Sequence, residues 1–195
     1  MKKLIAIAVA LGVFAGVANV LYAEFKRFNV YTDKAARDNH YIASGWMGDY
    51  GDLKLDLSCK DAPHSGATCI KVTYSGEQKQ GAGWTGIYWQ NPANNWGTKL
   101  GGYDLSGASK LVFRVKGAKG GEILSEVKIG GITGEYSDSD SASIGPITLT
   151  KEWKEYKIDL KGKDLSYVSG GFCFSASAAD NPEGFTIYFD DIYYE

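Results

Sequence analysis

Apolar and polar side chains alternate with a period of two residues through most of the chain after residue 50. Leu53, Leu55 and Leu57 alternate with polar residues, and the same pattern recurs at 70–74 and 156–160. Successive side chains of a β-strand point to opposite faces of a sheet, so this period predicts strands with one buried face. No long segment after the first 23 residues has the helical period of an amphipathic helix. A chain with this pattern is constrained to fold mainly as β-sheet.

Glycine separates these strand-like runs. The sequence has 25 glycines in 195 residues, a high share for a helical protein, and they cluster at sites such as 117–121. Glycine clusters end strands and permit turns. Short strands at regular spacing therefore predict an all-β fold, a two-sheet antiparallel β-sandwich (jelly roll) over roughly residues 45–195. The only candidates for short helical turns are 33–39 and 164–169.

The amino-terminal segment has the pattern of a secretory signal peptide. Lys2 and Lys3 form a basic start, residues 4–23 carry no charge, and the small residue Ala23 precedes Glu24. A charged start, an apolar middle and a small residue at the cleavage point are the marks of a leader that export removes. The sandwich is thus expected to be preceded by an N-terminal signal peptide or apolar helix.

Two alternatives remain for this leader. Cleavage is expected after Ala23, with Ala18 as the second position, whereas an apolar stretch of this length is also long enough to remain as a membrane anchor. Residues 1–23 are therefore assigned to a signal peptide or a retained anchor, and residues 24–195 to a single β-sandwich domain. The protein is expected to be secreted, periplasmic or on the cell surface, and to contact a membrane only if the leader is retained.

The charge pattern argues against nucleic acid as a partner. The formal net charge of the chain is −2, and no basic run occurs outside the leader. Nucleic-acid-binding domains present clustered lysines and arginines to the phosphate backbone. We therefore expect no nucleic-acid partner.

Two of the three cysteines are candidates for a disulfide bond. Cys59 and Cys69 flank the turn-rich segment 60–68, and an exported protein meets an oxidising compartment. Cys59 lies on the apolar side of its strand, whereas Cys69 alternates with polar residues, so the pairing requires a β-bulge or a strand-end position. Zinc is the competing interpretation, but two cysteines without a second pair make a weak zinc signature. Cys173, between two phenylalanines, is expected to be a buried free thiol.

The sequence offers no pattern typical of an active site. His40 and His64 are the only histidines, and neither belongs to a nucleophile or zinc-protease motif. Asp138 and Asp140 could be a carboxylate pair for glycoside hydrolysis, but two acids on one polar segment more often form a solvated loop. We therefore expect a protein without catalytic activity.

Aromatic residues are concentrated at 83–97. Trp84, Trp89 and Trp96 lie in this segment, and strand alternation places Trp84 on one face with Tyr88 while Trp89 lies on the other. Large aromatics bury well, so one of these faces is expected to belong to the core. A sugar ring has an apolar C–H face that stacks on aromatic rings and a rim of hydroxyl groups that bonds amides and carboxylates. The segment supplies both kinds of group.

The candidate glycan-binding residues follow from this composition. The expected platform is Trp84, Tyr88 and Trp96, with Gly86 leaving an open surface between the first two. Trp153 is expected in the core. The amides expected to bond sugar hydroxyls are Gln90, Asn94 and Asn95, and a second candidate patch is formed by Trp46 and Tyr50. Neutral amides and a net acidic domain favour a neutral polysaccharide or glycan as the ligand.

Three stretches resemble galactose-binding-like jelly-roll carbohydrate-binding modules. They are the closing segment 187–195, the segment 102–107 that runs into 110–115, and the segment 149–160. The resemblance implies a surface or secreted glycan-binding module without catalysis. It also implies one structural Ca²⁺, with Asp190 as a ligand and Asp33 or Asp38 as its partner.

The same sandwich also serves structural roles, because a fold does not fix a function. The alternative function is therefore a structural subunit of an extracellular filament or surface layer, for which self-association is expected.

Overall fold

The structure is a computed structural model that describes residues 24–195. The predicted signal peptide, residues 1–23, lies outside the described residues. Within residues 24–195 the chain forms thirteen strands and one short 3₁₀ helix, η1 (Tyr50–Asp52). No helix in this part of the chain is long and apolar enough to cross a membrane. The expectation of short helical turns at 33–39 and 164–169 is wrong, because the first segment forms non-helical turns and the second forms bends and a bridge between Val168 and Tyr103.

The first sheet, here called sheet A, has β13 (Phe185–Tyr194) at its centre, and all its pairs are antiparallel. Its strand order is β11 (Lys154–Asp159), β6 (Lys110–Gly117), β13, β4 (Cys69–Tyr74) and β3 (Leu53–Cys59), and β1 (Phe28–Tyr31) pairs with the far end of β13.

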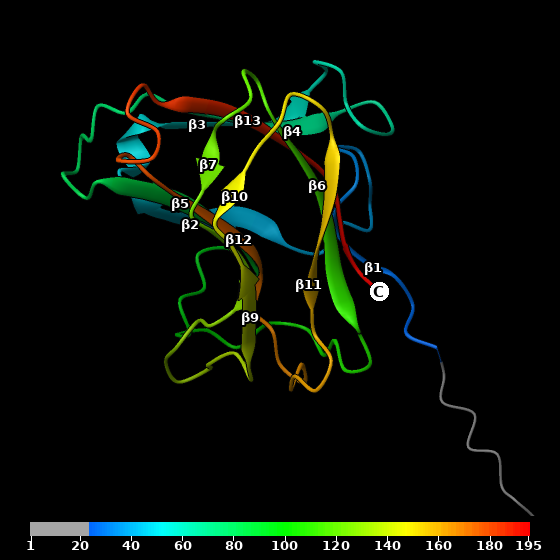
Figure 1. The fold of residues 1–195 in the computed structure, drawn as a ribbon. Helices are drawn as coiled ribbons and strands as arrows, with labels where there is room; N and C mark the ends of the chain where they lie inside the picture. Colours follow the sequence, from blue (N-terminus) through cyan, green and yellow to red (C-terminus); the bar gives the residue numbers. More distant parts are fainter. Residues whose placement is uncertain (1–23) are drawn as a thin grey trace, which may run out of the picture.

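The second sheet, sheet B, is also antiparallel, and β12 (Gly170–Ser177) lies at its centre. Its order is β2 (Ile42–Gly48), β5 (Trp84–Gln90), β12, β8 (Glu126–Gly130) and β9 (Ser141–Ile144). A separate ribbon joins β7 (Ile123–Leu124) and β10 (Ile147–Thr148). Figure 1 shows β13, β4 and β3 of sheet A above β2, β5 and β12 of sheet B.

Aromatic rings from both sheets meet in the core. Phe113 of β6 and Phe189 of β13 contact Phe172 of β12, with ring centroids 5.8 and 5.5 Å apart. All three side chains are fully buried. Large rings of this kind dominate the apolar area that a sandwich removes from water. The predicted two-sheet antiparallel β-fold is thus confirmed.

Trp153 is not in the core, contrary to our expectation. It is half-buried outside sheet A, and its Nε1 donates a hydrogen bond to the Ala62 carbonyl at 3.1 Å. The physical reason is strand parity. Tyr156 and Ile158 pair with core residues of β6, so Trp153 shares the opposite, outward face with Glu155.

Candidate binding surface

Strand β5 has one face in the core and the other on the outside of sheet B. Ile87 and Trp89 are buried in the main core, as the alternation predicts. Trp84, Gly86 and Tyr88 have the opposite parity and belong to the outer face. Strand pairing sets residues of β2 and β12 beside them, with Met47 opposite Gly86 and Cys173 opposite Tyr88.

A small apolar cluster lies on this outer face, separate from the main core. It consists of Tyr88, Ile132 and Cys173, with the half-buried Met47 packed against it. The Tyr88 hydroxyl donates a hydrogen bond to the Gly130 carbonyl at 3.0 Å, and burial raises the pKa of this phenol well above its usual range. An apolar cluster on the outer face of a sheet has no packing role in the sandwich core. The three side chains of the cluster are themselves buried, and the exposed apolar groups on this face are the tryptophans beside it, Trp84 and Trp96.

Trp96 covers the edge of this cluster. Its ring lies edge to face with that of Tyr88, with centroids 5.9 Å apart and planes at 84°, and its side chain is 42% exposed. Offset or edge-to-face geometry is the arrangement that aromatic pairs prefer. The structure therefore brings together two of the three residues of the predicted platform.

The loop that carries Trp96 is organised by a buried amide. Asn95 is fully buried: its Oδ1 accepts the N–H groups of Gly97 and Lys99, and its Nδ2 donates to the carbonyls of Asn91 and Lys99. Gln90 is also fully buried, donating to the Asn95 carbonyl and accepting from the Ser44 hydroxyl.

These two amides hold the loop, and because both are fully buried they do not face a sugar at the surface. Of the three amides expected to bond hydroxyls, only Asn94 is exposed. It has a positive φ of 55°, and its backbone N–H donates to the Ser44 hydroxyl.

Trp84 lies at the other end of β5 and is 40% exposed. The backbone around it is fixed, because the Asp49 N–H donates to the Trp84 carbonyl at 2.8 Å. The open surface expected at Gly86 is covered by Met47: a Cβ at Gly86 would lie 3.0 Å from the Met47 methyl and 2.5 Å from the Phe174 carbonyl oxygen. Met47 therefore lies over Gly86, between the positions of Trp84 and Tyr88 on this face of β5.

The second predicted patch does not lie on this face. Trp46 pairs with Ile87, so its side chain points to the opposite side of β2 from Met47. It is 39% exposed because β2 is an edge strand. Tyr50 lies beyond the end of β2, in η1, and is 54% exposed. The structure therefore separates Trp46 and Tyr50 from the platform.

Polar side chains continue the surface across β8 and β9. The Lys128 ammonium lies 5.3 Å from the centroid of the Tyr88 ring, a cation–π distance. Beside it a shallow hollow is lined by Glu126, Lys128, Ser141, Ala142, Ser143, Asp159 and Lys163. Sequence reasoning missed these residues. Their alternation in β8 and β9 was a usable signal, but which strands lie beside β5 depends on long-range pairing.

The two carboxylates considered for glycoside hydrolysis are occupied by other contacts. Asp138 accepts backbone N–H groups from Ile132, Ser169 and Gly170, and its partial burial raises its pKa. Asp140 accepts the Ser141 N–H and pairs with Lys163, and both contacts lower its pKa. The two groups act as separate loop anchors.

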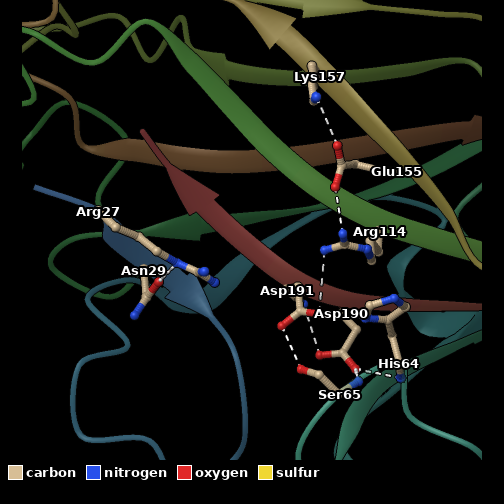
Figure 2. Close-up of polar contacts among 9 residues, drawn as sticks. All are labelled: Arg27, Asn29, His64, Ser65, Arg114, Glu155, Lys157, Asp190 and Asp191. Carbon is tan, nitrogen blue, oxygen red and sulfur yellow. Dashed lines mark hydrogen bonds and ion pairs between the residues drawn. The ribbon is translucent and has the colours of Figure 1, made fainter. Parts of the chain in front are cut away.

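Asp190 and Asp191 form a second polar cluster on sheet A (Figure 2). The Asp190 carboxylate accepts the backbone N–H groups of His64 at 2.9 Å and Ser65 at 3.2 Å. Asp191 accepts the Ser65 hydroxyl at 2.7 Å and contacts His64 Nδ1 at 2.7 Å. Asp191 has a positive φ of 47° at a break in the register between β13 and β6.

This arrangement does not fit the predicted calcium site. N–H groups already face the Asp190 carboxylate, and Asp33 accepts the Ala67 N–H and the Thr68 hydroxyl. These donors occupy acceptor positions that calcium would need, because calcium requires several oxygen ligands. Asp38 accepts from the Asn29 amide. Within residues 24–195 no group of three or more acidic, histidine or cysteine side chains is placed to hold a metal ion.

Cys59 and Cys69 are paired residues of β3 and β4, and a register shift between Asp56 and Cys59 is the bulge that the sequence required. Both are buried free thiols in the structure, and burial raises the pKa of Cys69 to about 12. Cys173 is buried, as predicted. The disulfide bond itself stays a prediction.

Solved structures with a similar fold identify the fold of this chain. No protein-family model and no curated protein sequence matches the chain. A crystal structure of a family 30 carbohydrate-binding module aligns over 87% of this chain and 87% of its own, with a TM-score of 0.59 and 19% identity. The family 30 module of a cellulosomal cellulase from Clostridium thermocellum aligns over 87% of this chain and 97% of its own, with a TM-score of 0.58 and 19% identity.

A variant of a family 29 module, solved in complex with mannohexaose, aligns over 87% of this chain and 90% of its own, with a TM-score of 0.50 and 11% identity. The resemblance noted in the sequence is thus confirmed at the level of structure. The chain has the β-sandwich jelly-roll fold of these carbohydrate-binding modules.

Proposed function

We propose that this protein is an exported module that binds neutral glycan chains without cleaving them. The proposed site is the outer face of sheet B, centred on Tyr88 and flanked by Trp84 and Trp96. The observation that carries the proposal is the apolar cluster outside the core, with an exposed tryptophan at each end. The fold shared with carbohydrate-binding modules supports the same function.

The chemistry of this face suits a sugar. Trp84 and Trp96 have exposed rings on which the C–H faces of a sugar ring can stack. Met47 covers Gly86 on the same face of β5. Asn94, Glu126 and Lys128 supply donors and acceptors for hydroxyl groups on the same side of the domain. Each aromatic contact contributes about 1 kcal/mol, so several are needed. The expected dissociation constants lie in the range from about 1 μM to 1 mM.

Affinity electrophoresis of the exported protein tests the proposal. Gels containing a neutral β-glucan or mannan are expected to retard it, and the Trp96→Ala variant is expected to be retarded less, with little change in melting temperature. No new reducing ends are expected in the polysaccharide. Failure of every neutral polysaccharide to retard the protein, together with large assemblies on size-exclusion chromatography, would favour the structural-subunit alternative instead.

A further inference from the structure

A row of aromatic and basic side chains crosses the outer face of sheet A. Strand pairing sets Lys116 of β6 opposite Tyr188 of β13, and Tyr188 opposite Lys71 of β4. The Lys116 ammonium lies 4.8 Å from the centroid of the Trp153 ring and 5.0 Å from that of Tyr188. These are cation–π distances. The Lys116 ammonium therefore contacts the Trp153 and Tyr188 rings at the same time.

A hollow lies beside this row, lined by Asp61, Ala62, Lys116, Gly117, Ala118, Lys151 and Tyr188. We call it the basic hollow. Its one carboxylate is neutralised, because Asp61 pairs with Lys71 at 3.1 Å. Lys116 and Lys151 take part in no ion pair within the described residues, 24–195. The basic hollow therefore presents two ammonium groups that are not in an ion pair, of which Lys116 is held by the Ala62 carbonyl and the two rings.

One wall of the basic hollow is a loop held in place by buried carboxylates. The Ala62 carbonyl accepts hydrogen bonds from Trp153 Nε1 at 3.1 Å and Lys116 Nζ at 3.3 Å. Two residues further along, His64 and Ser65 are bound by Asp190 and Asp191, as Figure 2 shows. Preorganised walls of this kind lower the ordering cost of binding.

We propose that the basic hollow is a second binding site, for a hexuronic acid unit of an acidic polysaccharide. Its carboxylate binds the Lys116 and Lys151 ammonium groups, and the C–H face of the sugar packs on the half-buried Tyr188 ring. The charge complementarity is local, because two lysines without ion pairs lie beside an aromatic ring on sheet A, whereas the proposed neutral-glycan face is on sheet B. A protein with both sites joins a neutral and an acidic polysaccharide, each on its own face.

The test uses oligogalacturonate of defined length as the probe and a neutral oligosaccharide of the same length as its control. Binding to the exported protein is followed by two-dimensional NMR at physiological salt. The variants are Lys116→Gln and Lys151→Gln, with Lys54→Gln as the matched control. Lys54 lies on sheet A, is exposed, and belongs neither to the basic hollow nor to an ion pair in the described part of the chain.

Saturable binding of the uronate is expected, with each hollow variant weakening it by about two- to fivefold and Lys54→Gln leaving it unchanged. Trp84→Ala is expected to leave uronate binding intact, which separates this site from the proposed neutral-glycan site. The proposal is overturned if the uronate does not saturate, if the neutral control binds equally well at this hollow, or if Lys54→Gln weakens binding as much as Lys116→Gln.

Discussion

Cys59 lies directly opposite Cys69 at the last paired position of β3 and β4, where the loop 60–68 begins and ends. Directly opposed residues of an antiparallel pair have Cβ atoms about 4.5–5.5 Å apart, close to the separation that a disulfide spans. This relationship makes the loop, which forms a wall of the basic hollow, a candidate for covalent closure.

We predict that the exported protein contains a Cys59–Cys69 disulfide. Because burial raises the pKa of Cys69 to about 12, the folded protein holds little of the reactive thiolate, so the bond is expected to form during folding. Replacing both cysteines with serine is expected to lower the free energy of unfolding by about 3 kcal/mol, by a denaturant melt. Recovery of both residues as free thiols from a non-reduced digest would contradict the prediction.

Asp190 is predicted to give the fold an unusual pH dependence. Burial raises the pKa of this carboxyl to about 6, above the value of about 3.9 in an unfolded chain. The folded state therefore binds the proton more tightly. The contribution to stability is fully present below about pH 4 and is lost as the pH rises through about 6.

Comparison with Asp190→Asn isolates this effect, because the amide does not titrate. The stability of the native protein relative to the variant is expected to fall as the pH rises from about 4 to about 6. Carbon NMR of the Asp190 carboxyl gives its pKa directly. A value at or below that of an exposed aspartate would contradict the assignment.

Asp49 is predicted to support the segment that leads into Trp84. Its buried carboxylate accepts the backbone N–H groups of Gln80, Ala82 and Gly83 at 3.1, 2.9 and 2.8 Å. In Asp49→Asn an amide N–H group must face one of these donors, so a loss of about 1–3 kcal/mol in unfolding free energy is expected. Asp104→Asn is the control, because this exposed carboxylate accepts from only Ser106. Equal effects of the two variants would contradict the anchoring role.

Calcium is predicted to have no effect on the melting temperature. The carboxylates of Asp190 and Asp33 already accept hydrogen bonds from the loop between β3 and β4. A chelator is therefore expected to leave the thermal transition in place. A fall in melting temperature with chelator, restored by Ca²⁺, would show that an oxygen shell forms there.

The local pattern of the sequence predicts the strands and the direction of many side chains. Alternation correctly separates Trp84 and Tyr88 from Ile87 and Trp89, because parity is a property of one strand. The same rule, applied at Trp153, would have placed that residue outside sheet A with Glu155. The sequence also indicated the β-bulge next to Cys59, because alternation alone puts Cys59 and Cys69 on opposite faces of the sheet.

Contacts between distant segments could not be predicted in this way. From the sequence we expected Gln90 and Asn95 to be exposed amides that bond a sugar. The loop after β5 folds back and buries both side chains. Ile132 and Lys128 reach Tyr88 only because β8 pairs with β12, far along the chain. Which side chains complete a surface is decided by such pairings, and a single sequence carries no local signal for them.

Three tryptophans test most directly whether the glycan binds the outer face of sheet B. Trp84, Trp96 and Trp46 are 40, 42 and 39% exposed, but only the first two are assigned to the platform. Titration of each alanine variant with a neutral oligosaccharide is expected to show binding weakened about five- to tenfold for Trp84→Ala and Trp96→Ala, and unchanged for Trp46→Ala. Equal weakening by all three, or by Trp46→Ala alone, would contradict the assignment of the site.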